Sequence, residues 1–151
     1  YGNIRIVTDN LPTSAVNGII RQSDAYISLH RSEGFGLTVA EAILGGTPVV
    51  STGWSGTVDF CDPDNTWNTS YQLIPVVDTH PEFAGLTGAR WADTDHEHAA
   101  AQLEEIAADR PAALARAEKA RAYLKHYLAE CTYGRALEQL AAAGAHPGQT
   151  H

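Results

Sequence analysis

Residues 30–50 read HRSEGFGLTVAEAILGGTPVV, and this stretch carries the clearest secondary-structure signals of the chain. After a glycine-rich break, apolar side chains recur at helical spacing over 37–44. The glycines that follow favour the end of a helix. The run at 48–51 is rich in valine and begins with proline, which a strand tolerates at its first position. The stretch therefore predicts a helix that leads directly into a strand.

Upstream of this stretch, three further elements are expected. Residues 4–8 are a short β-branched run typical of a strand, 13–23 read as a helix, and 25–29 read as a second strand. The resulting order of strand, helix, strand, helix, strand predicts an α/β fold with a Rossmann-like parallel sheet flanked by helices. In this class of fold, ligands bind beyond the carboxyl ends of the strands.

Downstream, the chain first becomes irregular and then helical. Residues 53–92 are rich in Gly, Pro, Asn, Asp and Trp, and 71–77 form the only convincing strand among them. Two alanine-rich helices are expected over 95–108 and 111–130, and Thr132 is placed to cap a last one. The fold should therefore end in a helical C-terminal segment.

Length and composition indicate one globular domain of 151 residues, expected over 1–143 with a disordered tail at 144–151. A formal net charge of −8 with only ten Lys and Arg residues argues against nucleic-acid binding. Cys61 and Cys131 lie far apart, which favours a reducing cytoplasm. The chain lacks methionine and opens at Tyr1 on strand-like sequence, so it is expected to be a fragment of a longer protein.

The glycines of this central stretch lie where the chain passes from a strand into a helix that begins at about Phe35 or Gly36. A helix N-terminus attracts anions because its first N–H groups have no intrahelical partner, and glycine lets a ligand approach the backbone closely. Glu33 lies just before the helix and Glu41 lies inside it, so both carboxylates could accept sugar hydroxyls around a bound diphosphate. The alternative from these residues alone is a tight turn followed by ordinary acidic residues near a helix start.

Two other groups of residues are candidates for a site. His96 and His98 are spaced by two, which on a helix directs them to different faces and argues against a metal site. Tryptophans 54, 67 and 91 flank the irregular region, where either sugar stacking or structural anchoring would use them.

The spacing of Glu33 and Glu41 resembles the Glu-x7-Glu signature of the GT4-type retaining glycosyltransferases, in register with the glycines between them. The chain departs from that family at 29–30, where Leu-His replaces the common Pro-Ser. The similarity extends to 23–25, 45–50 and 55–56. The segments 55–60, 71–76 and 91–93 resemble a branch of this family that is associated with bacterial surface polysaccharides.

This resemblance implies a site for a nucleotide-diphosphate-sugar donor, with no metal and no further cofactor. Glu33 is implied as the catalytic residue that orients the sugar, and Glu41 as the residue that bonds the ribose. The backbone of Gly34, Phe35, Gly36 and Leu37 is implied to hold the diphosphate, and Val7 and Thr8 to border the base.

The resemblance also implies that the chain is part of the C-terminal, donor-binding domain of a GT-B enzyme of the hexosyltransferase type. The family's basic diphosphate-binding pair and its acceptor-binding domain would then lie upstream, so the chain alone is expected to be inactive. A glycan or lipid-linked acceptor is expected to bind through that missing N-terminal domain. A cytoplasmic location is implied, with peripheral association of the full-length protein at the inner face of the membrane.

Three alternatives remain open from the sequence. One is a nucleotide-sugar epimerase of the same fold. Another is a glycosidase that uses Glu33 and Glu41 as a carboxylate pair, although the helix N-terminus between them argues against it. The last is a non-catalytic or truncated nucleotide-sugar-binding module.

Overall fold

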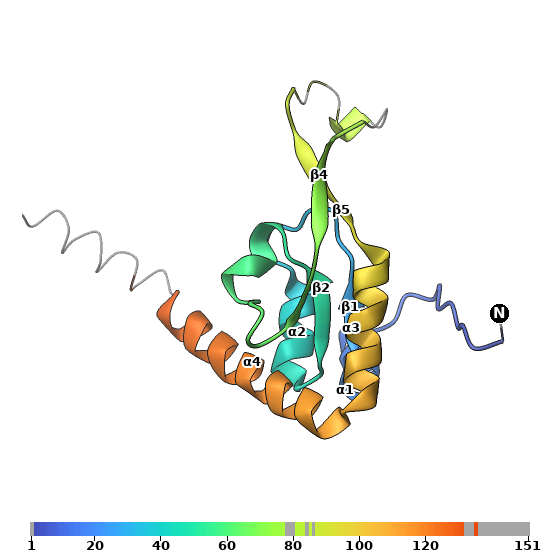
Figure 1. Ribbon diagram of the computed structural model, residues 1–151, viewed down its shortest axis with the longest axis vertical. Helices are drawn as coiled ribbons and strands as arrows, with labels where there is room; N and C mark the ends of the chain where they lie inside the picture. The colour runs from blue at the N-terminus through green and yellow to red at the C-terminus, as the bar shows by residue number, and fades with distance from the viewer. Residues whose placement is uncertain (1, 78–80, 84, 86, 132–134, 136–151) are drawn as a thin grey trace, which may run out of the picture.

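The computed structural model describes residues 2–77, 81–83, 85, 87–131 and 135 (Figure 1). A parallel sheet of three short strands lies at its centre, in the order β1-β2-β3. A separate antiparallel ribbon, β4–β5, extends away from this sheet. The helices are α1 (Thr13–Gln22), α2 (Leu37–Gly45), α3 (His96–Ala108), α4 (Arg110–Glu130) and the short 3-10 helices η1 (Ser55–Asp59) and η2 (Pro81–Phe83); the strands are β1 (Tyr26–Ser28), β2 (Val49–Thr52), β3 (Trp67–Thr69), β4 (Tyr71–Pro75) and β5 (Arg90–Thr94).

Strand β2 is the centre of the core, and all four of its residues are buried. Successive strand residues face opposite sides of a sheet, so neighbouring valines serve different layers. Val49 packs into a cluster built from α1, α2 and α4, whereas Val50 packs with Trp67 and the buried side of α3. Helices therefore cover both faces of the sheet, and the predicted α/β fold with a parallel sheet is confirmed.

The helices and strands expected between residues 13 and 51, and the two helices expected after residue 95, all form, with ends shifted by one or two residues. Their patterns combine a periodic apolar face with turn residues at the ends. Asp95 and Asp109 cap α3 and α4, since their carboxylates accept from His98 N–H and Ala112 N–H at 3.0 Å each. The helix expected to begin at Thr132 and the tail at 144–151 lie outside the described residues.

The strand expected over residues 4–8 is wrong. These residues are exposed, form no strand, and pair with no other described segment. Ile4 and Ile6 are 63% and 81% exposed. A β-branched run favours extended backbone, but a strand also needs a neighbour for its N–H and C=O groups.

The prediction of one strand within 53–92 is also incomplete. Strand β4 lies where it was expected, but β3 and β5 form as well. β3 pairs in parallel with β2, and β5 pairs antiparallel with β4, with Tyr71 opposite Thr94 and Ile74 opposite Trp91. Both missed strands contain Asn or Asp, which are uncommon in strands, and tertiary pairing overrides that preference.

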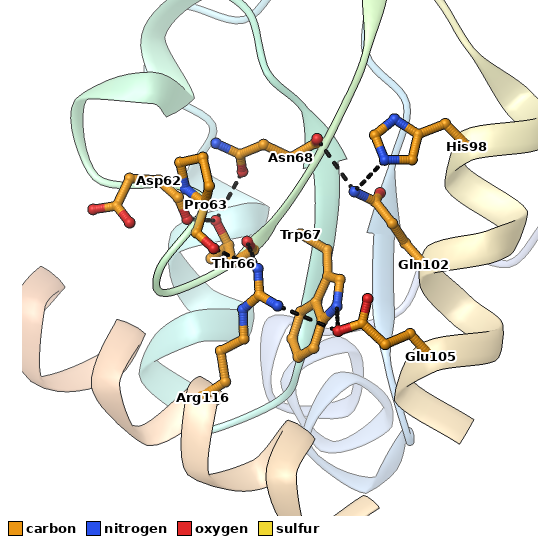
Figure 2. A network of polar contacts seen from close by, with 9 residues as sticks. All are labelled: Asp62, Pro63, Thr66, Trp67, Asn68, His98, Gln102, Glu105 and Arg116. Carbon is orange, nitrogen blue, oxygen red and sulfur yellow. Dashed lines mark hydrogen bonds and ion pairs between the residues drawn. The ribbon is translucent and has the colours of Figure 1, made fainter. Parts of the chain in front are cut away.

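Arg116 of α4 holds β3 and the loop before it in place (Figure 2). Its guanidinium donates to the carbonyls of Pro63 and Thr66 at 2.6 Å each and lies over the ring of Trp67, 4.0 Å from the centroid. The indole N–H of Trp67 in turn donates to Glu105 of α3 at 2.9 Å. Of the two roles possible for Trp67, sugar stacking and structural anchoring, the structure shows anchoring.

Cys61 is buried beneath α4 and α2, whereas Cys131 is exposed. Burial raises the pKa of the Cys61 thiol from 9.0 to about 11, with smaller opposing effects from Thr66 and Ser51. Because the thiolate is the reactive form, iodoacetamide at pH 8 should modify Cys131 and spare Cys61 until the protein is unfolded in urea. Modified-peptide mass spectrometry would measure this, and rapid native labelling of Cys61 would contradict its burial.

The same raised pKa fixes the sign of a pH effect. The folded state holds the Cys61 proton more tightly than the unfolded chain does. The contribution of the protonated thiol to the free energy of unfolding is therefore complete below pH 9 and is lost as the pH rises through about 11.

None of the helices among the described residues is both long enough and apolar enough to cross a membrane.

Candidate functional site

The candidate site lies where the parallel strands β1 and β2 end on the same edge of the sheet. After β1 the chain runs through residues 29–36 into α2, and after β2 it runs through 53–54 into η1. Because parallel strands share a direction, these two connections are brought side by side (Figure 1). This edge is where α/β folds bind their ligands.

An open hollow of about 420 Å³ lies at the N-terminus of α2, lined by Glu33, Phe35, Gly36, Leu37 and Thr38. The helix begins at Leu37, one or two residues later than expected. Its first N–H groups have no intrahelical acceptor, so the hollow is an environment that favours an anion. Among the described residues no Lys or Arg lines this hollow.

Gly36 is required at the N-cap of α2 for two reasons. Its backbone is left-handed, with φ at +86°, which an L side chain rarely adopts. A Cβ there would also lie 2.5 Å from Cγ2 of Thr57, a fully buried residue of η1. The glycine therefore lets η1 pack against the start of α2.

The backbone of Glu33 is held on both sides by the start of η1. Its N–H donates to the Ser55 hydroxyl at 2.8 Å, and its carbonyl accepts from the Gly56 N–H at 3.1 Å. Gly56 lies so close that a Cβ on it would be 1.8 Å from the Gly34 carbonyl oxygen. The two loops therefore contact each other backbone to backbone.

His30 ties the end of β1 to the same loop. Its Nε2–H donates to the Trp54 carbonyl at 3.1 Å, and Nδ1 then accepts from the Ser28 hydroxyl at 3.3 Å. The Thr57 hydroxyl also donates to that carbonyl, at 3.4 Å. His30 thus has a structural function: it joins the end of β1 to the loop that precedes η1.

The two carboxylates differ in position. Glu33 is half-buried and lines the hollow, whereas Glu41 is half-buried in the second turn of α2 and is not part of the lining. Neither carboxylate has a hydrogen-bond or ion-pair partner within the described ranges, so both are free to accept from a ligand.

Of the residues predicted from the sequence, the structure gathers Glu33, Phe35, Gly36 and Leu37 around one hollow, with Gly34 exposed beside them. Leu37 is 71% exposed. Val7 and Thr8 lie in the exposed N-terminal segment and are not among the lining residues. The roles of Glu41, Val7 and Thr8 stay predictions.

Arg31, next to this site, is directed toward the β4–β5 ribbon. Its guanidinium lies over the ring of Trp91 at 4.8 Å from the centroid, and its carbonyl accepts from Ala92 N–H at 2.9 Å. Trp54 packs against Tyr71 of β4, with ring centroids 5.5 Å apart. The ribbon is therefore fastened to both connections that form the site.

Of the two histidines considered for metal binding, His98 bonds to Ser70. His98 Nδ1 accepts from the Ser70 N–H at 3.1 Å, and the Ser70 hydroxyl lies 2.8 Å from the same nitrogen. His96 is exposed at the start of α3. Within the described part of the chain, no group of three His, Cys, Asp or Glu side chains is arranged to hold a metal ion.

Sequence reasoning did not find the roles of Ser55, Thr57 and His30. The contacts that join the two connections link residues more than twenty positions apart: Glu33 with Ser55, His30 with Trp54, and Thr57 with His30. Ser55 lies within a segment that resembles a family glycine loop, which marked the position but gave no role for its hydroxyl.

Comparison with known proteins gives one family. Residues 12–140 match the family model described as "GT4-conflict: Family 4 Glycosyltransferase in conflict systems". This range contains the whole parallel sheet and the Glu33 hollow. No curated protein matches the chain.

Proposed function

The chain belongs to the family 4 glycosyltransferases of conflict systems, and on this basis we propose that it transfers a sugar from a nucleotide-diphosphate-sugar to an acceptor with retention of configuration. Membership gives glycosyl transfer as its general role. The donor type, the stereochemistry and the assignment of residues are the proposal. The observation that carries it is the hollow at the start of α2, with a free carboxylate beside a helix N-terminus.

The proposed donor position follows from the charges around this hollow. The diphosphate lies against the first N–H groups of α2, near Gly34 and Gly36, where the helix dipole favours negative charge. Such an interaction is worth about 0.3–1 kcal/mol for an exposed anion. The nucleoside diphosphate is the leaving group. N–H groups fixed in this position therefore stabilise the negative charge that develops on it as the bond between the sugar and the phosphate breaks.

Glu33 is the proposed catalytic residue, in the sense that its carboxylate accepts hydroxyls of the donor sugar and fixes the anomeric carbon. A carboxylate would be repelled by phosphate, which is why it suits the sugar end of the donor. Glu41 is proposed to bond the ribose, and Val7 and Thr8 to border the base. No metal or further cofactor enters this proposal.

The acceptor is proposed to be a glycan or a lipid-linked sugar that binds outside this chain. Membership of this family favours a role in a conflict system. The segments at 55–60, 71–76 and 91–93 instead resemble enzymes of surface polysaccharide synthesis. Assays with extracted cell-envelope glycans and with purified cytosolic components as acceptors would separate these two settings.

Donor binding should be measured by ligand-observed NMR with UDP, GDP and ADP on the full-length protein. We expect one nucleotide to bind and Glu41→Ala to weaken it roughly 10- to 100-fold, because a ribose hydroxyl loses a charged acceptor. Glu104→Ala is the matched control, since Glu104 is exposed on α3 and has no described partner. An unchanged affinity in Glu41→Ala would refute the ribose assignment.

Turnover separates an enzyme from a binding module. Glu33→Gln should lower kcat with a nucleotide-sugar roughly 10- to 100-fold while circular dichroism and nucleotide affinity stay as in the wild type. The anomeric configuration of the product, read from its NMR coupling constants, tests retention. A wild-type protein that binds nucleotide but never releases a sugar product would instead be a non-catalytic module.

A further inference from the structure

Ser55 has a backbone conformation that a non-glycine residue rarely adopts. Its φ is +65°, and it is the one non-glycine residue with a positive φ in the described ranges. For an L residue this left-handed region brings Cβ close to the backbone, so the conformation persists only where surrounding contacts enforce it. A glycine would adopt it freely, and glycines stand close by in the same loop, at 53 and 56.

The contacts that enforce this conformation converge on Glu33. The Ser55 hydroxyl accepts the Glu33 N–H at 2.8 Å, and the adjacent Gly56 N–H donates to the Glu33 carbonyl at 3.1 Å. Trp54, on the other side of Ser55, is fixed by His30 through its carbonyl. Both backbone polar groups of Glu33 are therefore bonded by two consecutive residues of a loop that is itself anchored to β1.

This arrangement fixes the backbone of Glu33 and leaves its carboxylate free. The side chain lines the hollow at the start of α2 and has no described partner. A carboxylate that must accept sugar hydroxyls needs a backbone held in a fixed position, because small displacements of the groups that hold a substrate reduce reaction rates strongly. A hydroxyl is needed for this contact, which explains why a serine stands where glycine would be less strained.

We propose that Ser55 is a positioning residue for glycosyl transfer: its strained backbone directs its hydroxyl to the Glu33 amide and so aims the Glu33 carboxylate at the donor sugar. The proposal rests on the proposed function. Ser55 acts through Glu33 and takes no part in bond making or breaking.

Three substitutions in the full-length protein separate this function from a structural one. Ser55→Gly removes the hydroxyl and relieves the strain, Ser55→Ala removes the hydroxyl and keeps the strain, and Ser55→Thr keeps a hydroxyl but adds a β-branched side chain at positive φ. Stability should therefore fall in the order Gly, Ala, Thr. Activity should follow the hydroxyl instead, with kcat near the wild-type value in Ser55→Thr and roughly 3- to 10-fold lower in Ser55→Gly and Ser55→Ala.

The measurements are kcat and KM with the nucleotide-sugar below the melting temperature of every variant, together with urea unfolding. We expect the two hydroxyl-free variants to lose kcat while nucleotide affinity stays within about twofold, as for an interaction made in the transition state. A kcat that follows the stability order, with Ser55→Thr the slowest, would overturn the proposal.

A second readout does not depend on turnover. Hydrogen exchange of the Glu33 amide should be faster in Ser55→Gly and Ser55→Ala than in the wild type and Ser55→Thr, because only the latter two keep its acceptor. Unchanged exchange in all variants would overturn the hydrogen bond from the Glu33 N–H to the Ser55 hydroxyl on which the proposal rests. A wild type without turnover but with hydroxyl-dependent exchange would refute the proposed function and leave this hydrogen bond as a structural contact only.

Discussion

Gly56→Ala should lower the free energy of unfolding and disrupt the candidate site around Glu33. The new Cβ would lie 1.8 Å from the carbonyl oxygen of Gly34 and 2.6 Å from its carbon, and neither backbone atom can rotate away. The loops must separate, which breaks the Gly56–Glu33 bond at 3.1 Å and strains the Ser55–Glu33 bond at 2.8 Å. Overpacking and the lost hydrogen bonds together should lower the free energy of unfolding by about 2–4 kcal/mol, measured by urea denaturation.

Two other glycines provide controls for Gly56→Ala. Gly34→Ala places its Cβ in open space, so the free energy of unfolding should change by less than about 0.5 kcal/mol. Gly46→Ala also meets no atom within 4 Å, but its φ of +81° should make it less stable by about 1–2 kcal/mol. If Gly56→Ala proved as stable as Gly34→Ala, the close packing of the two loops would be wrong.

The central part of the fold could be predicted because its signals are local. Between residues 13 and 52, helices show apolar spacing of three and four, and the strands are short apolar runs that glycine and proline separate from α2. These patterns gave α1, β1, α2 and β2 to within two residues. The parallel sheet then followed from the order of the elements.

Strand pairing could not be predicted in the same way. Residues 4–8 have the composition of a strand and form none, whereas β3 includes Asn68 and forms because β2 lies beside it and Trp67 is buried against α3. What makes a three-residue segment a strand is its neighbour, and that neighbour is set by the tertiary structure.

The candidate site was only partly visible from the sequence. Glu33 and the glycines lie on one continuous stretch, so their proximity follows from the chain itself. The positive φ of Ser55 and the bond from His30 to Trp54 depend on how two connections pack, and no residue pattern encodes them. The sequence also placed Glu41 with Glu33, but only Glu33 lines the hollow.

Arg116→Ala should be among the most destabilising substitutions on α4 (Figure 2). The variant loses two charge-assisted bonds of 2.6 Å, to the carbonyls of Pro63 and Thr66, and a cation over the ring of Trp67. Bonds to charged groups contribute about 1.5–3 kcal/mol each and a cation–π contact about 0.5–2 kcal/mol. These effects are not fully additive, so we expect a loss of about 3–5 kcal/mol and a melting temperature roughly 10 °C lower, measured by calorimetry.

Two variants test whether geometry or charge is responsible. Arg116→Lys keeps the charge, but an ammonium is not planar and cannot stack on the indole while it donates to both carbonyls, so it should recover less than half of the lost stability. Arg121→Ala removes a charge from the same helix, where its 3.3 Å pair with Glu118 is partly exposed, and should change the free energy of unfolding by less than about 0.5 kcal/mol. Equal losses of the free energy of unfolding in Arg116→Ala and Arg121→Ala would mean that the charge on the helix is responsible, and that the contacts of the Arg116 guanidinium are not. Because β3 begins directly after Thr66, whose carbonyl Arg116 binds, we also expect Arg116→Ala to weaken the pairing of β3 with β2.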